Sequence, residues 1–480
     1  MRLIFTCFCL LPVLGFGQIA DSSYARGQIY IKLRDNITIH DAGKSETLNK
    51  RGELSFIQAL LGNKSASKIE KPFYTPNSER LQRIYKIEFL LPEQVQEVIS
   101  KLLQDPAVEY AERVPVDRKV YVPNDYTPPN GYFVGQYNLE IINAIRAWDI
   151  TRGSGAIVVA VTDDGVATSH VDLAANLVAG RDVVYDDNDP NPDRSDDDHG
   201  THVAGIVSAT TDNNRGIASL GFSIKVMPVK IADNQGRLIQ AYKGVRWAAD
   251  NGARVINMSW GSPTFSQSNQ DVINYAASRG CVLVASAGND AASSFNYPAA
   301  YDNVISVAST DIADVRSFFS NFGSWIDIAA PGSAILSTLL NNTYGLIGGT
   351  SMASPLVASL AGLMLSVNPT MNRTQVEAGI KATADNINAQ NPNYIGQLGA
   401  GRINAFNAVN WAATVYSTAS GSWTGSNWTY QAPSQHTNPV IQAGHTVTVP
   451  SGTYPVRNTL NINGTLDLST TSSVLNINNN

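Results

Sequence analysis

Cysteine is scarce in this sequence: its 480 residues contain three, Cys7, Cys9 and Cys281. The first two lie within residues 1–17, which have the pattern of a secretory signal peptide cut near Gly17: one basic residue, an apolar run and small residues. The mature chain then keeps only Cys281 and cannot form an intramolecular disulfide. Because Cys281 lies in an apolar run, we expect a packed structural thiol rather than a reactive one.

Long apolar runs and an excess of positive charge are also missing. The apolar run within residues 1–17 is too short to span a bilayer comfortably, and no later segment is predicted to span a membrane. The chain has 34 Lys and Arg against 40 Asp and Glu, a net charge of −6. This balance argues against a nucleic-acid-binding protein. An apolar content of 43% with 15% charged residues is typical of a globular protein.

Glutamate almost disappears after residue 120. Residues 21–120 hold 16 Lys and Arg and 14 Asp and Glu, whereas residues 121–480 hold 17 and 26, a net charge of −9. Of those 26 acids 24 are aspartate, which favours turns and helix N-caps and is a compact ligand for hard cations. A loop-rich surface and calcium binding both account for this composition, and both stay open.

The hydrophobic pattern divides the chain after the signal peptide into regions. Residues 18–120 alternate strand and helix patterns, and the Pro-rich residues 121–134 predict an extended linker. Residues 135–412 have continuous apolar runs separated by helical patterns, which predicts an α/β fold: a doubly wound, mostly parallel sheet with helices on both faces. Residues 413–480, rich in Ser, Thr and Asn, predict a small β module or the first turns of a β-solenoid. The pattern runs on to Asn480, which leaves open that this β-rich region is incomplete.

Four polar motifs fall where the α/β pattern places junctions between strands and helices. Asp163 ends a long apolar strand, His199 opens a helix, Asn289 follows a strand and Ser351 opens the longest apolar helix. Ligands of such sheets bind at the carboxyl ends of the strands. The motifs together supply an acid, an imidazole, an amide donor and a hydroxyl, each beside glycines that let backbone or substrate approach closely.

These motifs, in the chain order Asp, His, Asn, Ser, resemble those of the subtilisin-type serine peptidases, the subtilase family. The resemblance covers residues 135–412 and includes further blocks at 256–261, 319–323, 329–332 and 401–405. It implies that Ser351 is the nucleophile, His199 the general base and then acid, and Asp163 the carboxylate that orients the imidazole. Asn289 would donate its side-chain amide to the developing oxyanion. The chemistry needs this set, because a serine hydroxyl is a poor nucleophile until a base of fixed tautomer takes its proton.

The resemblance also implies a substrate site. The segment Ser259, Trp260 and Gly261 resembles the edge on which an extended substrate backbone pairs as an added strand. Asn296 falls where the family often has glycine at the base of the pocket for the residue before the scissile bond, which implies a shortened pocket with a polar floor. Asp164 resembles the DDG motif of proprotein convertases, but the other motifs resemble the bacterial branch, so cleavage after paired basic residues is not inferred.

A structural calcium ion is the one cofactor that the resemblance implies, and no organic cofactor is expected. Asp172 matches a position that often binds calcium in the family, and the implied partners are Gln136 and the loop Asp212–Asn214, with Asp212 as its candidate ligand. Bound calcium would stabilise an exported chain that has no disulfide. The acidic run Asp196–Asp198 is interpreted as a solvated loop.

Residues 18–120 look like the family's propeptide, a small α+β domain that assists folding and inhibits the site until removed. A permanent N-terminal domain is the alternative, and processing is expected between Arg113 and Asp125. The sequence therefore predicts a secreted or cell-surface serine endopeptidase that acts on polypeptides and processes its own precursor. One rival is a surface adhesion or glycan-binding protein that acts through the C-terminal β region, where Trp423 and Trp428 are candidates for stacking on sugars. Another rival is an esterase with the same three catalytic residues.

Overall fold

The computed structural model describes residues 24–37, 53–62, 66–89, 95–115, 121–128, 135–429, 432–433, 437–450, 452–456, 460–463, 465–467 and 473–477. The predicted signal peptide, residues 1–17, lies outside the described residues. The chain divides into two compact units, and the larger one, Val120–Tyr416 with Gly425–Thr437, is called the α/β unit below.

The N-terminal part has an antiparallel sheet with strand order β2-β3-β1-β4. Its elements are β1 (Tyr24–Leu33), α1 (Glu53–Leu61), β2 (Ala66–Glu70), α2 (Glu79–Gln82), β3 (Ile84–Phe89), α3 (Val95–Leu102) and β4 (Val108–Pro115). Helix α3 buries Val95, Val98, Ile99 and Leu102, the spacing of one helical face, against this sheet's core. This is the small α+β fold that the family resemblance implies for residues 18–120.

A seven-stranded sheet forms the centre of the α/β unit, and every adjacent pair in it is parallel. Its strand order is β11-β10-β9-β8-β5-β7-β6. The strands are β5 (Val158–Asp163), β6 (Arg181–Asp182), β7 (Lys225–Lys230), β8 (Val255–Met258), β9 (Val282–Ser286), β10 (Val304–Thr310) and β11 (Ile328–Pro331). The parallel sheet predicted from the apolar runs is thereby confirmed.

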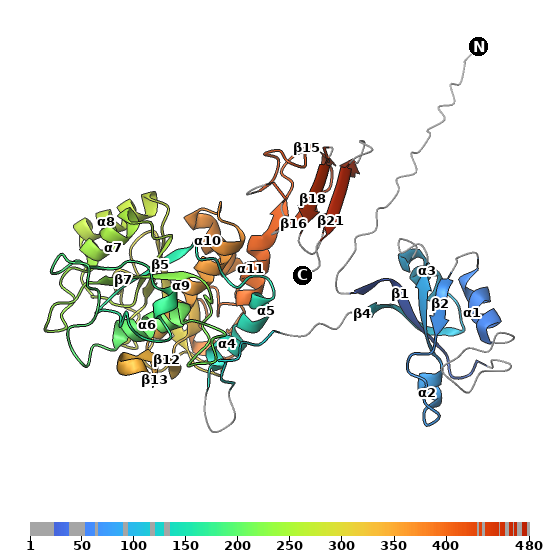
Figure 1. Ribbon diagram of the computed structural model, residues 1–480, viewed down its shortest axis with the longest axis horizontal. Coiled ribbons are helices and arrows are strands. Elements are labelled where there is room, and N and C mark those ends of the chain that lie inside the picture. Colours follow the sequence, from blue (N-terminus) through green and yellow to red (C-terminus); the bar gives the residue numbers. More distant parts are fainter. Residues whose placement is uncertain are drawn as a thin grey trace, which may run out of the picture. The chain divides into compact units, whose positions relative to one another are not determined.

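Both faces of this sheet are covered by helices, because the inner strands send apolar side chains to both sides (Figure 1). Val159, Val161 and Val284 pack on one face with α6 (His199–Ser208), α9 (Thr350–Val367) and α11 (Ala405–Ala413). Ala160 and Leu283 point the other way, toward α7 (Ala241–Asp250) and α8 (Gln267–Ser278). Strands that bury both faces lose the polar alternation of a surface strand, which is why they appear as continuous apolar runs.

The other elements of the α/β unit surround this core. They are the helices α4 (Tyr137–Ile141), α5 (Ala144–Trp148) and α10 (Arg373–Ala382), and the antiparallel hairpin of β12 (Ile335–Leu339) and β13 (Thr343–Ile347). Within the described ranges, α9 is the one helix whose length and apolar composition would allow it to cross a bilayer, and 89% of it is buried inside the protein.

The last six of the C-terminal strands pair in parallel at a nearly constant sequence offset. The strands are β14 (Thr414–Tyr416), β15 (Gly421–Ser422), β16 (Asn438–Ile441), β17 (Thr446–Thr448), β18 (Gly452–Val456), β19 (Asn461–Ile462), β20 (Thr465–Asp467) and β21 (Ser473–Ile477). Val440 pairs with Asn461, Thr446 with Thr465 and Gly452 with Ser473. Parallel pairing of three successive strands with the next three is the arrangement of successive coils in a β-solenoid.

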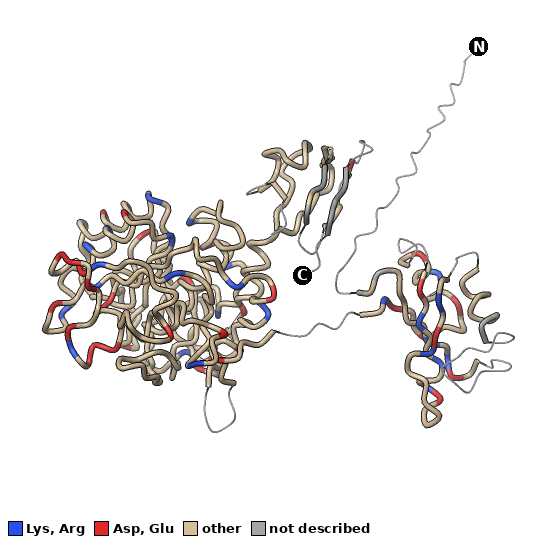
Figure 2. The backbone as a smooth tube through the Cα atoms, viewed as in Figure 1, with Lys and Arg blue, Asp and Glu red and all other residues tan. Residues whose placement is uncertain are grey.

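The composition of these C-terminal strands also differs from that of the rest of the chain. Figure 2 shows charged residues throughout the α/β unit and the N-terminal sheet but almost none on the described C-terminal strands. Trp423 is fully buried and Trp428 is 5% exposed. Both indoles are packed within the protein, so neither presents the open aromatic face that a sugar needs.

Candidate active site

Asp163 and His199 form a hydrogen-bonded pair at the carboxyl edge of the sheet. Asp163 is the last residue of β5 and His199 the first of α6, and His199 Nδ1 lies 2.8 Å from Asp163 Oδ1. Asp163 Oδ1 also accepts the backbone N–H of Asp164 at 2.9 Å, whereas its Oδ2 is buried with no hydrogen-bond partner among the described residues. The carboxylate therefore fixes the orientation of the imidazole and leaves His199 Nε2 free to act.

Charge and burial act in opposite directions on His199. Burial disfavours the charged imidazolium, but the Asp163 carboxylate and its hydrogen bond outweigh this effect and raise the pKa of His199. Asp164 adds a second carboxyl beside the pair, and its Oδ1 accepts the backbone N–H of Gly200 at 2.7 Å. Burial, followed by the charge of Asp163, raises the pKa of Asp164 to about 7.

Ser351 lies in the first turn of α9. Its hydroxyl donates to the carbonyl oxygen of Ser259 at 3.1 Å, and its own carbonyl accepts the Ser259 hydroxyl at 2.8 Å. No hydrogen bond joins Ser351 to His199 within the part of the chain that the structure describes. Catalytic hydrogen bonds of this kind often tighten only when substrate binds. The partial positive charge at the N-terminus of this 18-residue helix favours a nearby oxyanion.

Asn289 follows β9 and faces the start of α9. Its Oδ1 accepts two hydrogen bonds from Thr350, from the backbone N–H at 2.9 Å and from the hydroxyl at 2.9 Å. Its amide nitrogen lies 3.4 Å from the position a Cβ would take on Gly349. Because Thr350 occupies the oxygen of the amide, the NH2 group is left to donate beside Ser351. The sequence motifs did not single out Thr350, although it directly precedes Ser351.

The segment Ser259–Gly261 and Asn296 lie against each other at Gly261. A Cβ on Gly261 would lie 2.2 Å from Asn296 Nδ2, and a Cβ on Gly288 would lie 3.1 Å from the same atom. Asn296 is 9% exposed, and its amide makes no hydrogen bond to any other residue in the described ranges. Trp260 is held by its indole N–H, which donates to the carbonyl oxygen of Thr162 at 2.9 Å. The missing side chains of Gly261 and Gly288 thus make room for the Asn296 amide itself.

The three residues implied as calcium ligands are not brought together as a set. Gln136 uses its whole amide on backbone groups: Nε2 donates to the Ala218 carbonyl at 2.6 Å, and Oε1 accepts the N–H groups of Ala218 and Thr127. Asp212 is exposed and accepts the N–H of Asn124 at 3.2 Å. Neither side chain has an oxygen directed at Asp172.

Asp172 instead faces Asn213, which lies in the implied loop, and Asp125, which the sequence reasoning missed. Asp172 is fully buried, and Asn213 Nδ2 donates to its Oδ1 at 2.7 Å. Asp125 accepts the backbone N–H of Asn213 at 3.1 Å. Burial raises the pKa of both carboxyls, and the charge of Asp172 raises that of Asp125 further. Asp125 Oδ1 and Asn213 Oδ1 are buried oxygens with no hydrogen-bond partner among the described residues.

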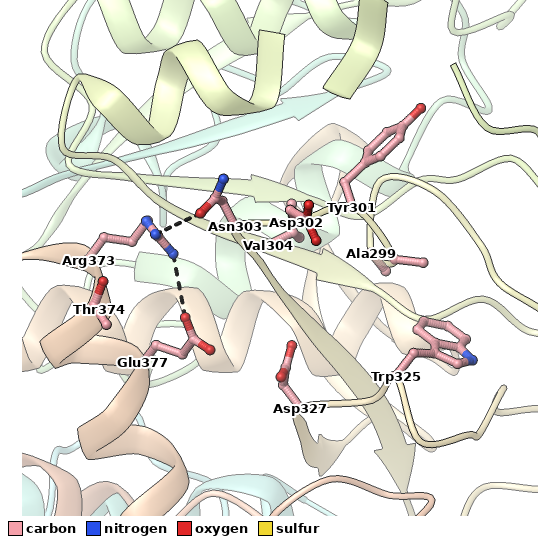
Figure 3. A pocket seen from close by; sticks show the side chains of 11 residues that line it. Ala299, Tyr301, Asp302, Asn303, Val304, Trp325, Asp327, Arg373, Thr374 and Glu377 are labelled. Carbon is pink, nitrogen blue, oxygen red and sulfur yellow. Dashed lines mark hydrogen bonds and ion pairs between the residues drawn. The ribbon is translucent and has the colours of Figure 1, made fainter. Parts of the chain in front are cut away.

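A cleft of about 590 Å³ lies elsewhere on the α/β unit, beside the start of β10 (Figure 3). Three of its charged side chains, those of Arg373, Glu377 and Asp327, already have partners. Arg373 donates to Asn303 at 2.8 Å and pairs with Glu377 at 3.6 Å, while Asp327 pairs with Lys381 at 2.7 Å. The candidate catalytic residues belong to the opposite, carboxyl ends of the strands, so the cleft is not part of the site.

Comparison with known proteins agrees with this geometry. Residues 154–401 match the model of the Subtilase family (Peptidase_S8). A thermophilic serine proteinase of Bacillus sp. (strain AK1) is 34% identical over 389 residues, which are 81% of this chain and 88% of that protein. Thermitase of Thermoactinomyces vulgaris is 43% identical over 287 residues, 59% of this chain and 99% of thermitase. A solved protease structure from Pseudoalteromonas arctica PAMC 21717 is 33% identical, with a TM-score of 0.55 over 61% of this chain and all of that one.

Proposed function

Because the chain belongs to the subtilase family and is a serine endopeptidase, we propose that Ser351 is its nucleophile, His199 its general base and Asp163 the carboxylate that orients the base. The observation that carries this assignment is the 2.8 Å contact of His199 Nδ1 with the buried Asp163 carboxylate. With a proton held on Nδ1, the lone pair of Nε2 is available to take the proton of a serine hydroxyl.

The proposed reaction then proceeds in two halves. An extended polypeptide pairs along Ser259–Gly261, and Ser351 Oγ adds to the scissile carbonyl carbon as His199 takes the hydroxyl proton. The oxyanion accepts hydrogen bonds from Asn289 Nδ2 and the backbone N–H of Ser351. Collapse breaks the C–N bond, and His199 gives its proton to the leaving amine. Water repeats the sequence on the acyl-enzyme and restores Ser351.

Asn296 is proposed to form the floor of the pocket for the side chain before the scissile bond. Its amide has no partner among the described residues, and it lies so close to Gly261 that a Cβ there would clash with it. An amide without a protein partner at this position favours a side chain that can hydrogen bond to it over an apolar one of equal size. Peptides that differ only in Gln or Met at this position test the assignment: the Gln peptide is expected to have the higher kcat/KM.

Covalent labelling tests the nucleophile. A phosphonyl fluoride is expected to inactivate the enzyme irreversibly and to add to the peptide that contains Ser351. Ser351→Ala is expected to remove labelling and turnover together. Ser366→Ala is the matched control, because Ser366 lies on the same helix and donates to the Gly362 carbonyl at 2.8 Å. Turnover by Ser351→Ala, or an adduct on another serine, would contradict the assignment.

The N-terminal α+β part is proposed to be a propeptide that the enzyme removes from itself, and the signal pattern of residues 1–17 supports secretion. Two contacts limit where the peptide bond that is cut during processing can lie. Strand β4 belongs to the N-terminal sheet up to Pro115, while the Tyr121 ring stacks 3.6 Å from the Arg152 guanidinium carbon within the α/β unit. Cleavage that leaves both intact falls after Pro115 and before Tyr121. N-terminal sequencing of the secreted protein is expected to begin there, and the Ser351→Ala precursor is expected to stay uncut.

Calcium is proposed to bind between Asp125, Asp172 and Asn213. The residues fit a hard cation, because two buried carboxylates share the space and two of the oxygens have no partner among the described residues. Bound calcium would offset their repulsion and stabilise the fold. Removing calcium with EDTA from Ser351→Ala protein is expected to lower the thermal midpoint. The free energy of unfolding is expected to fall by about 2.7 kcal/mol when the free calcium concentration had been about 100 times the Kd of the site.

Two variants separate this calcium site from the ligands implied by the sequence. Asp125→Asn is expected to weaken calcium binding, measured by calorimetry, and to make the thermal midpoint insensitive to EDTA. Asp212→Asn, which changes an exposed carboxylate, is expected to keep both properties. The reverse pattern would show that Asp212, not Asp125, is the calcium ligand. A thermal midpoint of the parent protein that does not change with EDTA would show that no stabilising calcium site exists.

A further inference from the structure

Asn321 is a buried asparagine that holds the loop carrying Asn289. This loop, residues 287–292, is called the Asn289 loop below. Asn321 is 1% exposed, and its side chain makes three hydrogen bonds to the loop. Its Nδ2 donates to the carbonyl oxygen of Ala287 at 2.9 Å, and its Oδ1 accepts the N–H groups of Asp290 at 2.9 Å and Ala292 at 3.1 Å.

Backbone contacts add to this clamp. The N–H of Asn321 donates to the carbonyl oxygen of Gly288 at 2.9 Å, and the N–H of Ala291 donates to the carbonyl of Phe319 at 2.8 Å. Gly288 has a positive φ of 103°, and a Cβ there would lie 2.5 Å from Asn321 Nδ2. Glycine at this position is therefore what lets the amide of Asn321 reach the loop. The bonds fall on both sides of Asn289 and leave its side chain out of the clamp.

The segment before Asn321 is itself fixed by Arg316. One guanidinium nitrogen donates to the carbonyls of Ser317 at 3.1 Å and of Ser320, and the other donates to the Tyr394 hydroxyl at 3.1 Å. The guanidinium also lies over the rings of Phe322 and Tyr394. The segment that carries Asn321 is thus tied through Arg316 to Tyr394, which lies outside it.

Two supports therefore determine where Asn289 Nδ2 points. Thr350 takes both hydrogen bonds of the amide oxygen, which sets the rotation of the side chain. The clamp sets the position of the backbone from which that side chain extends. A donor aimed at an oxyanion stabilises it only if it is held in place before charge develops, because movement at that moment costs free energy.

We propose that Asn321 is a positioning residue of the oxyanion hole, which acts on catalysis through Asn289. The proposal rests on the oxyanion role proposed above for Asn289. It assigns to Asn321 an effect on the transition state rather than on substrate binding. A clamp with a structural role alone would lower stability without a specific loss of kcat that depends on Asn289. The two roles therefore give different kinetics.

A double-mutant cycle on the full chain tests the proposal. Asn321→Ser is expected to lower kcat about tenfold or more with KM within about twofold, since small misplacement of a catalytic group is costly. Combined with Asn289→Ala, the same change is expected to lower kcat by less than about twofold, because the donor it positions is gone. Each precursor is matured with a trace of wild-type enzyme and then purified from it, so that slow self-processing does not bias the comparison.

Asn176→Ser is the matched control. Asn176 is also buried, and its amide likewise joins separate segments, donating to the carbonyls of Ser208 at 3.3 Å and Phe222 at 2.8 Å, but it does not touch the Asn289 loop. Its replacement is expected to leave kcat within twofold of the parent in both backgrounds. If Asn321→Ser does not fold, Asn321→Asp is tested by the same double-mutant cycle. Aspartate keeps the shape of the side chain and both acceptor hydrogen bonds, but it replaces the donor to the Ala287 carbonyl by a carboxylate oxygen that repels it.

The outcomes separate the two proposals. If Asn289→Ala leaves kcat unchanged, the oxyanion role of Asn289 is wrong. If Asn289→Ala lowers kcat but the Asn321 change lowers it by the same factor in both backgrounds, Asn321 does not act through Asn289 and the positioning role is overturned. A rise in KM at unchanged kcat overturns it as well.

Discussion

Replacing Asp163 by asparagine would remove the charge from the centre of the site while keeping the shape of the side chain. Asp163 Oδ1 accepts hydrogen bonds from His199 Nδ1 at 2.8 Å and from the Asp164 N–H at 2.9 Å. The amide must place its oxygen at this position, because its NH2 group would face the Asp164 N–H donor there. The NH2 group then replaces Oδ2, which has no partner within the described ranges. Asp163→Asn therefore keeps the tautomer and orientation of His199 and loses only the charge.

The size of the effect follows from the burial of the pair. Asp163 is 2% exposed, and removing one charged partner of a buried hydrogen-bonded pair costs about 3–5 kcal/mol. Here that cost falls on the transition state, in which His199 is protonated, so kcat is expected to fall by about 10² to 10⁴. The pKa of His199, which Asp163 raises, is expected to fall. Because the neutral imidazole is the base, the acid limb of the kcat/KM profile moves to lower pH.

The folded state should respond differently from the transition state. The carboxylate is buried with one oxygen unpaired, and the amide exchanges that desolvated charge for an unpaired NH2 group, so the two costs largely cancel. The thermal midpoint of Asp163→Asn, measured in a Ser351→Ala background, is expected to lie within a few degrees of its parent.

The assay is the pH profile of kcat/KM for hydrolysis of a peptide anilide between pH 4 and 9, with wild type and Asp163→Asn matured and purified in parallel. An acid midpoint that stays in place or moves to higher pH would show that the charge of Asp163 does not set the basicity of His199. A midpoint of thermal unfolding that drops by more than about 10 °C would show that the carboxylate is needed for the fold itself.

Three further predictions follow from neighbouring contacts. Asp164→Asn removes a second negative charge that raises the pKa of His199, so the acid limb should move to lower pH by less than in Asp163→Asn, with the plateau kcat retained; a shift toward higher pH would contradict this. Thr350→Val removes the hydroxyl that donates to Asn289 at 2.9 Å and should lower kcat about tenfold at constant KM, and an unchanged kcat would refute the orienting role. Lys230→Met removes the ammonium that contacts the Asp182 carboxylate at 2.9 Å and the Asp193 carboxylate at 2.6 Å. Urea unfolding in a Ser351→Ala background should show a loss of about 3–5 kcal/mol, and a loss below about 1 kcal/mol would show that water replaces the lysine.

The sequence predicts the inner strands of the sheet well and its edges poorly. Strand β8, Val255–Met258, is fully buried and apolar except for Asn257, because a strand buried on both faces needs a nearly continuous apolar run. Edge strand β6 consists of Arg181 and Asp182 alone and is held by parallel pairing with β7. Such a strand has no apolar pattern of its own, so nothing in the local sequence marks it.

For the catalytic groups, sequence motifs place the residues but not their supports. Asp163, His199, Asn289 and Ser351 each lie in a glycine-rich motif with a recognisable order. Asn321 lies in a block that the family resemblance includes, yet its identity alone does not show that its amide bonds to three backbone groups of a loop about 30 residues earlier. Hydrogen bonds between distant loops depend on the folded geometry, which no local pattern encodes.

The calcium ligands show the same limit in a sharper form. A cation needs oxygens that the protein has left without a partner, and residue type does not reveal which oxygens those are. Gln136 has a suitable oxygen, but backbone N–H groups of the folded chain already occupy it. Asp125 lies in a stretch expected to be a linker, yet the fold buries it and leaves its Oδ1 unpaired within the described residues. A ligand is therefore identified by its unmet hydrogen-bonding capacity in the folded state, and Asp125→Asn against Asp212→Asn measures that property directly.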